Sequence, residues 1–157
     1  MARHLVLVVA ASQSDVPALS ETQKTLDSFG VRSKLVVVSA HRQPGKVRAL
    51  ASSARRDGIK VIIAGAGMAA HLAGVMASYT TVPVIGVPLC AEPFGALDSL
   101  LSTVQMPSGV PVAVVSVGRA GAINAAILAV EMLAMKDASL AAKLDRYRRH
   151  RRPRSKA

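Results

Sequence analysis

Short, almost wholly apolar segments alternate along this chain with segments in which apolar residues recur at helical spacing. Val16–Phe29, for example, carries Leu19, Leu26 and Phe29 on one helical face and stops at Gly30, a frequent helix end. The pattern predicts strands at residues 4–11, 35–38, 61–64, 82–87 and 112–117. It predicts helices at residues 16–29, 44–57, 69–79, 99–104 and 120–135, and a final polar helix from 137 to about 149.

The predicted strands have no polar alternation, which is typical of strands that are buried on both faces of a sheet. Alternation with helices makes such strands parallel. We therefore expect an α/β fold, a single-domain doubly wound three-layer sandwich around a parallel five-stranded sheet. Right-handed crossovers limit the topology, and we expect the flavodoxin-like strand order 2-1-3-4-5. We assign residues 1–142 to this domain and residues 143–157 to a basic helix end and tail.

The charge of the chain is concentrated at its C-terminal end. The 157 residues carry a formal net charge of +11. Segment 143–157 has eight basic residues and one acidic residue, which accounts for +7 and leaves +4 for the rest. Basic tails can bind nucleic acid, but only one aromatic residue, Tyr147, lies among the arginines. We therefore interpret the tail as a solvated helix end and do not expect a nucleic-acid partner.

Composition also bears on where the protein is located and on whether it binds a membrane or a metal. A single cysteine, Cys90, excludes an intrachain disulfide, and this fits a cytoplasmic location. No apolar run is long enough to span a membrane without Gly, Pro or polar interruptions, so we expect no membrane partner. The four histidines and the cysteine do not have the spacing of metal ligands, so we expect no metal site.

Small and hydroxyl residues follow the first predicted strand, where ligands bind in doubly wound sheets. Ser12, Ser14 and Asp15 stand at the start of the first helix, and the free amides there favour an anion such as phosphate. An ordinary helix cap is the alternative, since Ser and Asp are preferred at that position.

The second predicted strand ends in the polar segment Ser39, Ala40, His41 and Arg42. An arginine at the ligand edge can hold a phosphate through two hydrogen bonds. A histidine is the natural proton carrier near neutral pH. Surface charge on a capped turn is the alternative, but this is an unusually polar exit from a buried strand.

Small residues also follow the third predicted strand. Ala66 and Gly67 lie in a segment whose glycines would let bare backbone amides approach a ligand. The segment lacks the third glycine of the dinucleotide fingerprint. His71 follows on the next helix. It either faces the same pocket or has a purely structural role.

Taken together, these segments resemble the PurE family from about residue 4 to residue 148. The resemblance rests on five motifs, which are Ser12-Gln13-Ser14-Asp15, Ser39-Ala40-His41-Arg42, Ala64-Gly65-Ala66-Gly67 with Ala69-Ala70-His71-Leu72, Asp98-Ser99-Leu100-Leu101-Ser102 leading to Gln105-Met106-Pro107, and Gly118-Arg119-Ala120-Gly121-Ala122. The chain looks like the bacterial mutase branch, class I. The direct-carboxylase branch usually carries Lys after the histidine.

The resemblance implies interconversion of N5-carboxyaminoimidazole ribonucleotide and 4-carboxy-5-aminoimidazole ribonucleotide in purine synthesis. The reaction needs no metal or organic cofactor, and the family forms octamers with sites near subunit boundaries. Carbon dioxide is thought to leave the amine, stay trapped and add to the ring carbon. Carried over, His41 would move the proton, while Ser12, Asp15 and Arg42 would bind the ribose phosphate. The rest of the substrate pocket would be Ser14, Ser39, Ala40, Ala66, Gly67 and His71.

The chain departs from the family pattern near the expected pocket. The family usually has Gly at the positions of Ala11 and Met68, Thr at Gln43 and Pro at Ala73, and the loop at residues 89–96 also differs. Met68 places a large side chain beside the carbon dioxide pocket. Two alternatives therefore stay open. One is a divergent PurE-like carboxylase or decarboxylase of a related heterocyclic nucleotide, and the other is a nucleotide-binding protein without enzymatic activity.

Overall fold

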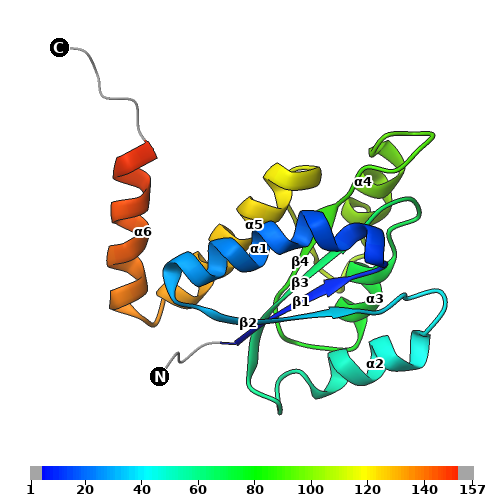
Figure 1. Ribbon diagram of the computed structural model, residues 1–157. Helices are drawn as coiled ribbons and strands as arrows, with labels where there is room; N and C mark the ends of the chain where they lie inside the picture. Colours follow the sequence, from blue (N-terminus) through cyan, green and yellow to red (C-terminus); the bar gives the residue numbers. More distant parts are fainter. Residues whose placement is uncertain (1–4, 152–157) are drawn as a thin grey trace.

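The computed structural model describes residues 5–151 and has a parallel sheet covered by helices on both faces (Figure 1). The strands are β1 (Leu5–Ala10), β2 (Arg32–Val37), β3 (Ile59–Ala66), β4 (Val84–Pro88) and β5 (Ala113–Val114). The helices are a 3₁₀ turn η1 (Gln13–Asp15), α1 (Val16–Phe29), α2 (Pro44–Ser53), α3 (Leu72–Ser78), α4 (Leu97–Val104), α5 (Gly118–Ala134) and α6 (Ala138–Arg151).

The five strands pair in the order β2-β1-β3-β4-β5, and every pair is parallel. The predicted α/β sandwich and its strand order are confirmed. Ala10 at the end of β1 lies between Val37 and Gly65, and Ala66 at the end of β3 pairs with Pro88. The carboxyl ends of four strands therefore meet at one edge, where the candidate segments begin.

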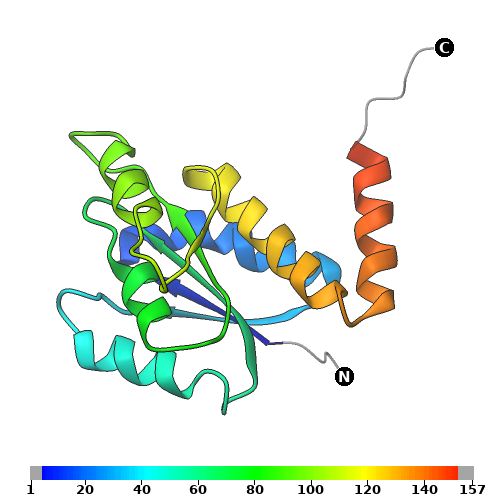
Figure 2. The same ribbon diagram turned by 180° about the vertical axis from the view of Figure 1, so that it is seen from behind.

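Two buried clusters hold the helices onto the sheet. One joins α1, α5 and α6 to one face, and the other joins α2 and α3 to the opposite face (Figures 1 and 2). Helix α5 lies very close to the backbone that precedes it, because a Cβ on Gly121 would overlap the Ser116 carbonyl oxygen at 1.6 Å. A buried hydrogen bond of 2.8 Å from Thr22 Oγ1 to the Ala122 carbonyl ties α1 to α5.

Helix α1 begins and ends as its sequence predicts. Ser12 and Asp15 form a capping box before it, Pro17 lies in its first turn, and Gly30 takes a left-handed φ of 74° after Phe29. Its 14 residues span about 21 Å from the carboxyl edge of the sheet to the amino edge.

Three predicted elements were too long. Helix α2 ends at Ser53 rather than 57, because the chain tightens into turns that lead to Gly58 at φ 79°. Helix α3 begins at Leu72 rather than 69, because residues 68–71 form a turn instead. The strand predicted at 112–117 pairs only at Ala113–Val114.

Helix α6 lies at one end of the sandwich, where it packs against α1 and α5 (Figure 1). It is continuous through residue 143, the boundary predicted between domain and tail. That boundary stays a prediction. The rest of the predicted basic tail, residues 152–157, lies outside the described residues.

Candidate functional site

The loop after β1 forms a compact hydroxyl and carboxyl cluster. Asp15 Oδ2 accepts hydrogen bonds of 2.9 Å from both the backbone N–H and the hydroxyl of Ser12. Ser14 Oγ lies 2.6 Å from Ser12 Oγ. Because the Ser12 proton goes to Asp15, Ser14 donates to Ser12 in this arrangement. An incoming anion would make the hydroxyls turn toward it, next to the first amides of the helix, which have no partner within the helix.

Asp15 is partly buried, and this changes its acidity. Burial raises the pKa of the Asp15 carboxyl above its ordinary value, while the two hydrogen bonds from Ser12 act in the opposite direction. The net effect favours the neutral carboxyl more than solvent would. A carboxyl that is less readily ionised repels a neighbouring phosphate less.

A cavity of about 560 Å³ lies between the loop after β1 and the loop after β2. Ser39 Oγ accepts a hydrogen bond of 3.3 Å from the Arg42 amide and so closes the turn. The Arg42 side chain is exposed and its guanidinium has no hydrogen bond or ion pair within residues 5–151. It is therefore available to an anion. The cavity is lined by Ala11, Ser12, Gln13, Ser14, Val37, Val38, Ser39, Arg42 and Gln43.

Two histidines from different segments meet beside this region. His41 Nε2 lies 2.8 Å from His71 Nδ1, and the rings meet edge to face with centroids 4.8 Å apart. His71 Nδ1 also lies 3.0 Å from the Ala69 carbonyl oxygen. A carbonyl can only accept, so it favours the His71 tautomer with the proton on Nδ1. In the neutral pair that choice leaves His41 Nε2 as the acceptor, so the ring proton of His41 is on Nδ1.

The loop after β3 carries an unusual backbone. Met68 has a φ of 55°, which makes it the one non-glycine residue within residues 5–151 with a left-handed φ. Its side chain is 60% exposed, so little protein packing offsets the strain. Next to it, a Cβ on Gly67 would lie 3.2 Å from the Ala91 side chain, so the loop at residues 89–96 packs closely here. A left-handed φ is a conformation that glycine adopts without strain, but here the residue is Met.

Met68→Gly should raise the free energy of unfolding by about 1 kcal/mol, because glycine adopts a left-handed φ without the Cβ clash. Chemical denaturation at a fixed protomer concentration measures the difference. The matched control is Met135→Gly, since Met135 is also exposed but has an ordinary φ of −56°. That control should lose about 0.5–1 kcal/mol. A loss of stability in both variants would contradict the prediction.

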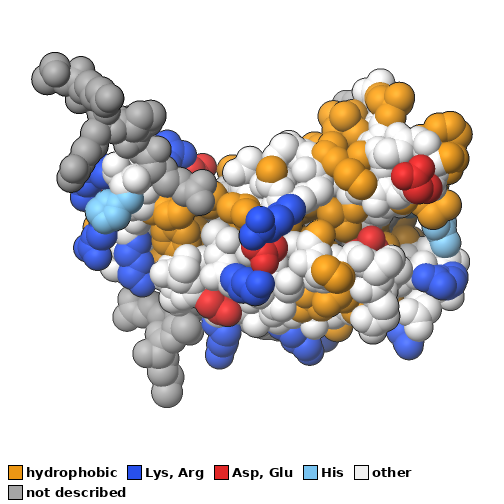
Figure 3. Space-filling view, turned by 45° about the horizontal axis from the view of Figure 1, so that its top comes forward, with side chains coloured by type: hydrophobic (Ala, Val, Ile, Leu, Met, Phe, Trp, Pro, Cys, Tyr) orange, Lys and Arg blue, Asp and Glu red, His pale blue; other side chains and the backbone are white. Residues whose placement is uncertain are grey.

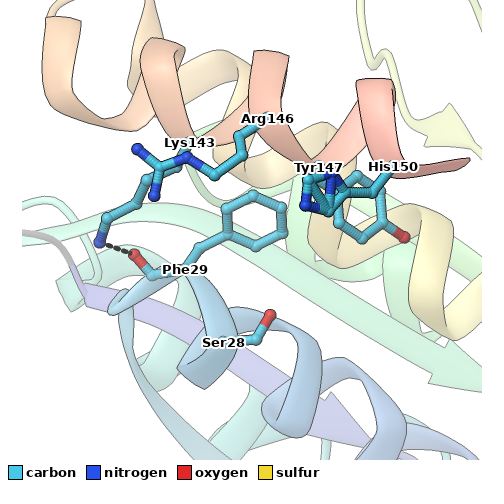
Figure 4. A pocket seen from close by; sticks show the side chains of 6 residues that line it. All are labelled: Ser28, Phe29, Lys143, Arg146, Tyr147 and His150. Atoms are coloured by element: carbon cyan, nitrogen blue, oxygen red, sulfur yellow. Dashed lines mark hydrogen bonds between the residues drawn. The ribbon is translucent and has the colours of Figure 1, made fainter.

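A second hollow, of about 440 Å³, lies where α1 ends against α6 (Figure 4). Lys143 Nζ donates to the Phe29 carbonyl at 2.6 Å, and the Phe29 and Tyr147 rings lie 5.3 Å apart. A cation at the negative end of a helix is stabilising, so Lys143 serves to attach α6 to α1. This hollow lies at the amino edge of the sheet and contains no predicted site residue; it is lined by Ser28, Phe29, Lys143, Arg146, Tyr147 and His150.

Within residues 5–151, no three side chains of His, Cys, Asp or Glu gather as a metal-binding group. No helix in that range has the length and apolarity needed to cross a membrane.

The predicted site residues fall into two neighbouring groups. The cavity holds Ser12, Ser14, Ser39 and Arg42, and Asp15 joins it through Ser12. The second group is the His41–His71 pair, which joins the loop after β2 to the loop after β3. Ala66 ends β3 and Gly67 follows it, while Ala40 packs on the core of the α2 and α3 face. Sequence reasoning gave no role to Gln13 and Gln43, which also line the cavity. The signal that could have identified them is their position in the sequence, next to residues that were predicted to bind the substrate.

Comparison with known proteins gives consistent matches over nearly the whole chain. The family model for AIR carboxylase matches residues 5–154. The chain is 51% identical over 144 residues to the N5-carboxyaminoimidazole ribonucleotide mutase of Bacillus subtilis, covering 92% of this chain and 89% of that protein. The mutase of Brucella melitensis is 48% identical over 144 residues, with the same coverage.

A third relative and a solved structure match as well. The N5-carboxyaminoimidazole ribonucleotide mutase of Pyrococcus abyssi is 50% identical over 141 residues, covering 90% of this chain and 80% of that protein. The crystal structure of Treponema denticola PurE superposes with a TM-score of 0.86 at 26% identity, covering 94% of this chain and 91% of that chain.

Proposed function

The chain belongs to the AIR carboxylase family, the PurE proteins, and we propose from this premise that it is an N5-carboxyaminoimidazole ribonucleotide mutase. The mutase would produce 4-carboxy-5-aminoimidazole ribonucleotide for purine synthesis, in the cytoplasm and without a metal or organic cofactor. The observation that carries the proposal is the pairing of His41 with His71 at 2.8 Å beside a cavity with a free guanidinium. The histidine pair suits proton transfer, and the cavity with its guanidinium suits a phosphate.

The proposed reaction needs one group that can both give and take a proton. The N–C bond of the carbamate breaks, the amine nitrogen gains a proton, and carbon dioxide is released inside the site. The ring carbon then forms a C–C bond to carbon dioxide and loses its own proton. The two proton movements cancel, so a single histidine can serve as acid and then as base. We assign this role to His41, with His71 holding its ring.

The groups that line the cavity are of the kinds that commonly bind phosphate in proteins. Ser12, Ser14 and Ser39 offer hydroxyls, Arg42 offers a guanidinium, and α1 presents its N-terminal amides. We place the ribose phosphate there and Asp15 beside it. A nucleotide anchored in this cavity would bring its aminoimidazole ring toward the strand end at Ala66 and Gly67.

A direct assay tests the function. Purified protein should interconvert the two carboxylated aminoimidazole ribonucleotides without ATP, metal or added bicarbonate, and it should restore growth of a purine-auxotrophic bacterium that lacks its own mutase. Failure of both tests with soluble protein that still binds aminoimidazole ribonucleotide would instead support a carboxylase or decarboxylase of a related nucleotide. The Met68 substitution and the altered loop at 89–96 are the features that would explain that outcome.

We further propose that the chain forms a symmetric homo-oligomer, an octamer. Apolar side chains are exposed on and before α4, where they follow helical spacing, and Figure 3 shows hydrophobic side chains gathered over this end of the molecule. They are Phe94, Leu97, Leu101 and Val104. Light scattering should give about eight protomers at micromolar concentration. A monomer at that concentration would count decisively against the assembly.

A further inference from the structure

We infer that Ser102 on α4 is a positioning residue for the histidine pair, and this inference rests on the proposed function. Ser102 touches neither histidine. Its hydroxyl accepts a hydrogen bond of 2.9 Å from the Ala70 amide, 32 residues away along the chain. The same hydroxyl donates to the Asp98 carbonyl at 2.6 Å within α4. Ser102 thus joins the loop after β3 to a helix.

The turn that Ser102 holds is the one that presents His71. Met68 reverses the chain with its left-handed φ, and the Ala69 carbonyl then accepts a hydrogen bond of 2.8 Å from the His71 amide. That carbonyl also lies 3.0 Å from His71 Nδ1. The hydrogen bonds run from α4 through Ala70 to Ala69 and from there to the imidazole. Moving Ala70 would move the acceptor that selects the His71 tautomer.

A purely local role for Ser102 does not account for its contacts. Serines in helices often donate to the carbonyl four residues earlier, and the bond to Asp98 is of that kind. The bond from the Ala70 amide serves a different segment, and Ala70 is only 3% exposed. Without the Ser102 hydroxyl, that buried amide would have to shift toward another acceptor. The turn would then carry the Ala69 carbonyl with it.

The consequence for catalysis is specific. If the Ala69 carbonyl leaves His71 Nδ1, the proton on Nδ1 is no longer favoured, and His71 Nδ1 can instead accept a hydrogen bond from a protonated His41 Nε2. His41 Nε2 would then carry the ring proton, and His41 Nδ1 would become the basic nitrogen, so the acidic and basic positions of the ring would be exchanged. Ser102 therefore affects turnover through the orientation and tautomer of the histidines, while the phosphate cavity is left as it is.

The test uses Ser102→Ala and Ser102→Thr in the full chain. Ser102→Ala should lower kcat by about 10- to 100-fold, the usual scale of a small misplacement of a reacting group, with KM for the nucleotide nearly unchanged. Ser102→Thr keeps the hydroxyl and should recover most of kcat. The control is Ser78→Ala, since Ser78 donates only to the Val75 carbonyl of its own helix.

A measurement without substrate separates this inference from the proposed function. Side-chain ¹⁵N NMR of the unliganded protein should show His71 with its proton on Nδ1 in the wild type and Ser78→Ala, and a changed His71 signal in Ser102→Ala. An unchanged histidine spectrum, or equal losses in Ser102→Ala and Ser78→Ala, would overturn the positioning role. A wild type without mutase activity would contradict the proposed function, whereas the spectrum would still decide the role of Ser102.

Discussion

His41→Asn should abolish measurable turnover while the protein keeps its fold and its affinity for the nucleotide. An amide can donate and accept hydrogen bonds but cannot shuttle a proton, and general acid–base catalysis contributes about 10²–10⁴-fold. The loss should appear in kcat, with KM little changed. His41 is exposed, so its replacement removes little buried surface. Steady-state kinetics and a binding titration with aminoimidazole ribonucleotide measure the two effects separately.

The matched control for His41 is another exposed histidine on the same chain. His150 lies on α6 in the hollow at the opposite edge of the sheet, and His150→Asn should leave kcat unchanged (Figure 4). If His41→Asn kept most of the wild-type activity, His41 would not be the acid–base group. His71 would then be the first candidate, because its Nδ1 lies 2.8 Å from His41 Nε2.

The fold followed from the sequence because burial controls it. Strands without polar alternation require cover on both faces, which predicts the sandwich. The right-handed crossovers between parallel strands then limit the strand order. Helix α1 was predicted to the residue, since Ser12, Asp15 and Gly30 are local signals that need no tertiary context. The resemblance to the PurE family, which came from contiguous motifs, is also confirmed.

The parts that sequence reasoning missed depend on contacts between distant segments. Helix α3 was predicted to start at 69, but residue 68 takes a left-handed φ that nothing in a methionine signals. The loop at residues 89–96 packs against Gly67, and Ser102 holds the Ala70 amide. Both contacts join segments more than 20 residues apart. The partner of His71 stayed open for the same reason, since 30 residues separate it from His41.

Arg42→Ala should weaken nucleotide binding by about 1.5–3 kcal/mol, the value of a hydrogen bond to a charged group. That corresponds to about 10- to 150-fold in Kd. The guanidinium has no partner within residues 5–151, so its removal disturbs no internal ion pair. The fold should therefore be unaffected, and kcat at saturating substrate should fall much less than kcat/KM. Calorimetric titration with aminoimidazole ribonucleotide gives the affinity directly.

The same variant decides whether Arg42 binds the phosphate or another part of the substrate. If it binds the phosphate, the wild type should prefer the nucleotide over the dephosphorylated nucleoside, and Arg42→Ala should lose most of that preference. Arg32→Ala is the matched control, because Arg32 is exposed at the start of β2, at the opposite edge of the sheet. It should bind as the wild type does. An undiminished preference for the nucleotide in Arg42→Ala would refute the phosphate assignment, and the hydroxyls of Ser12 and Ser14 with the α1 amides would then have to provide the phosphate site alone.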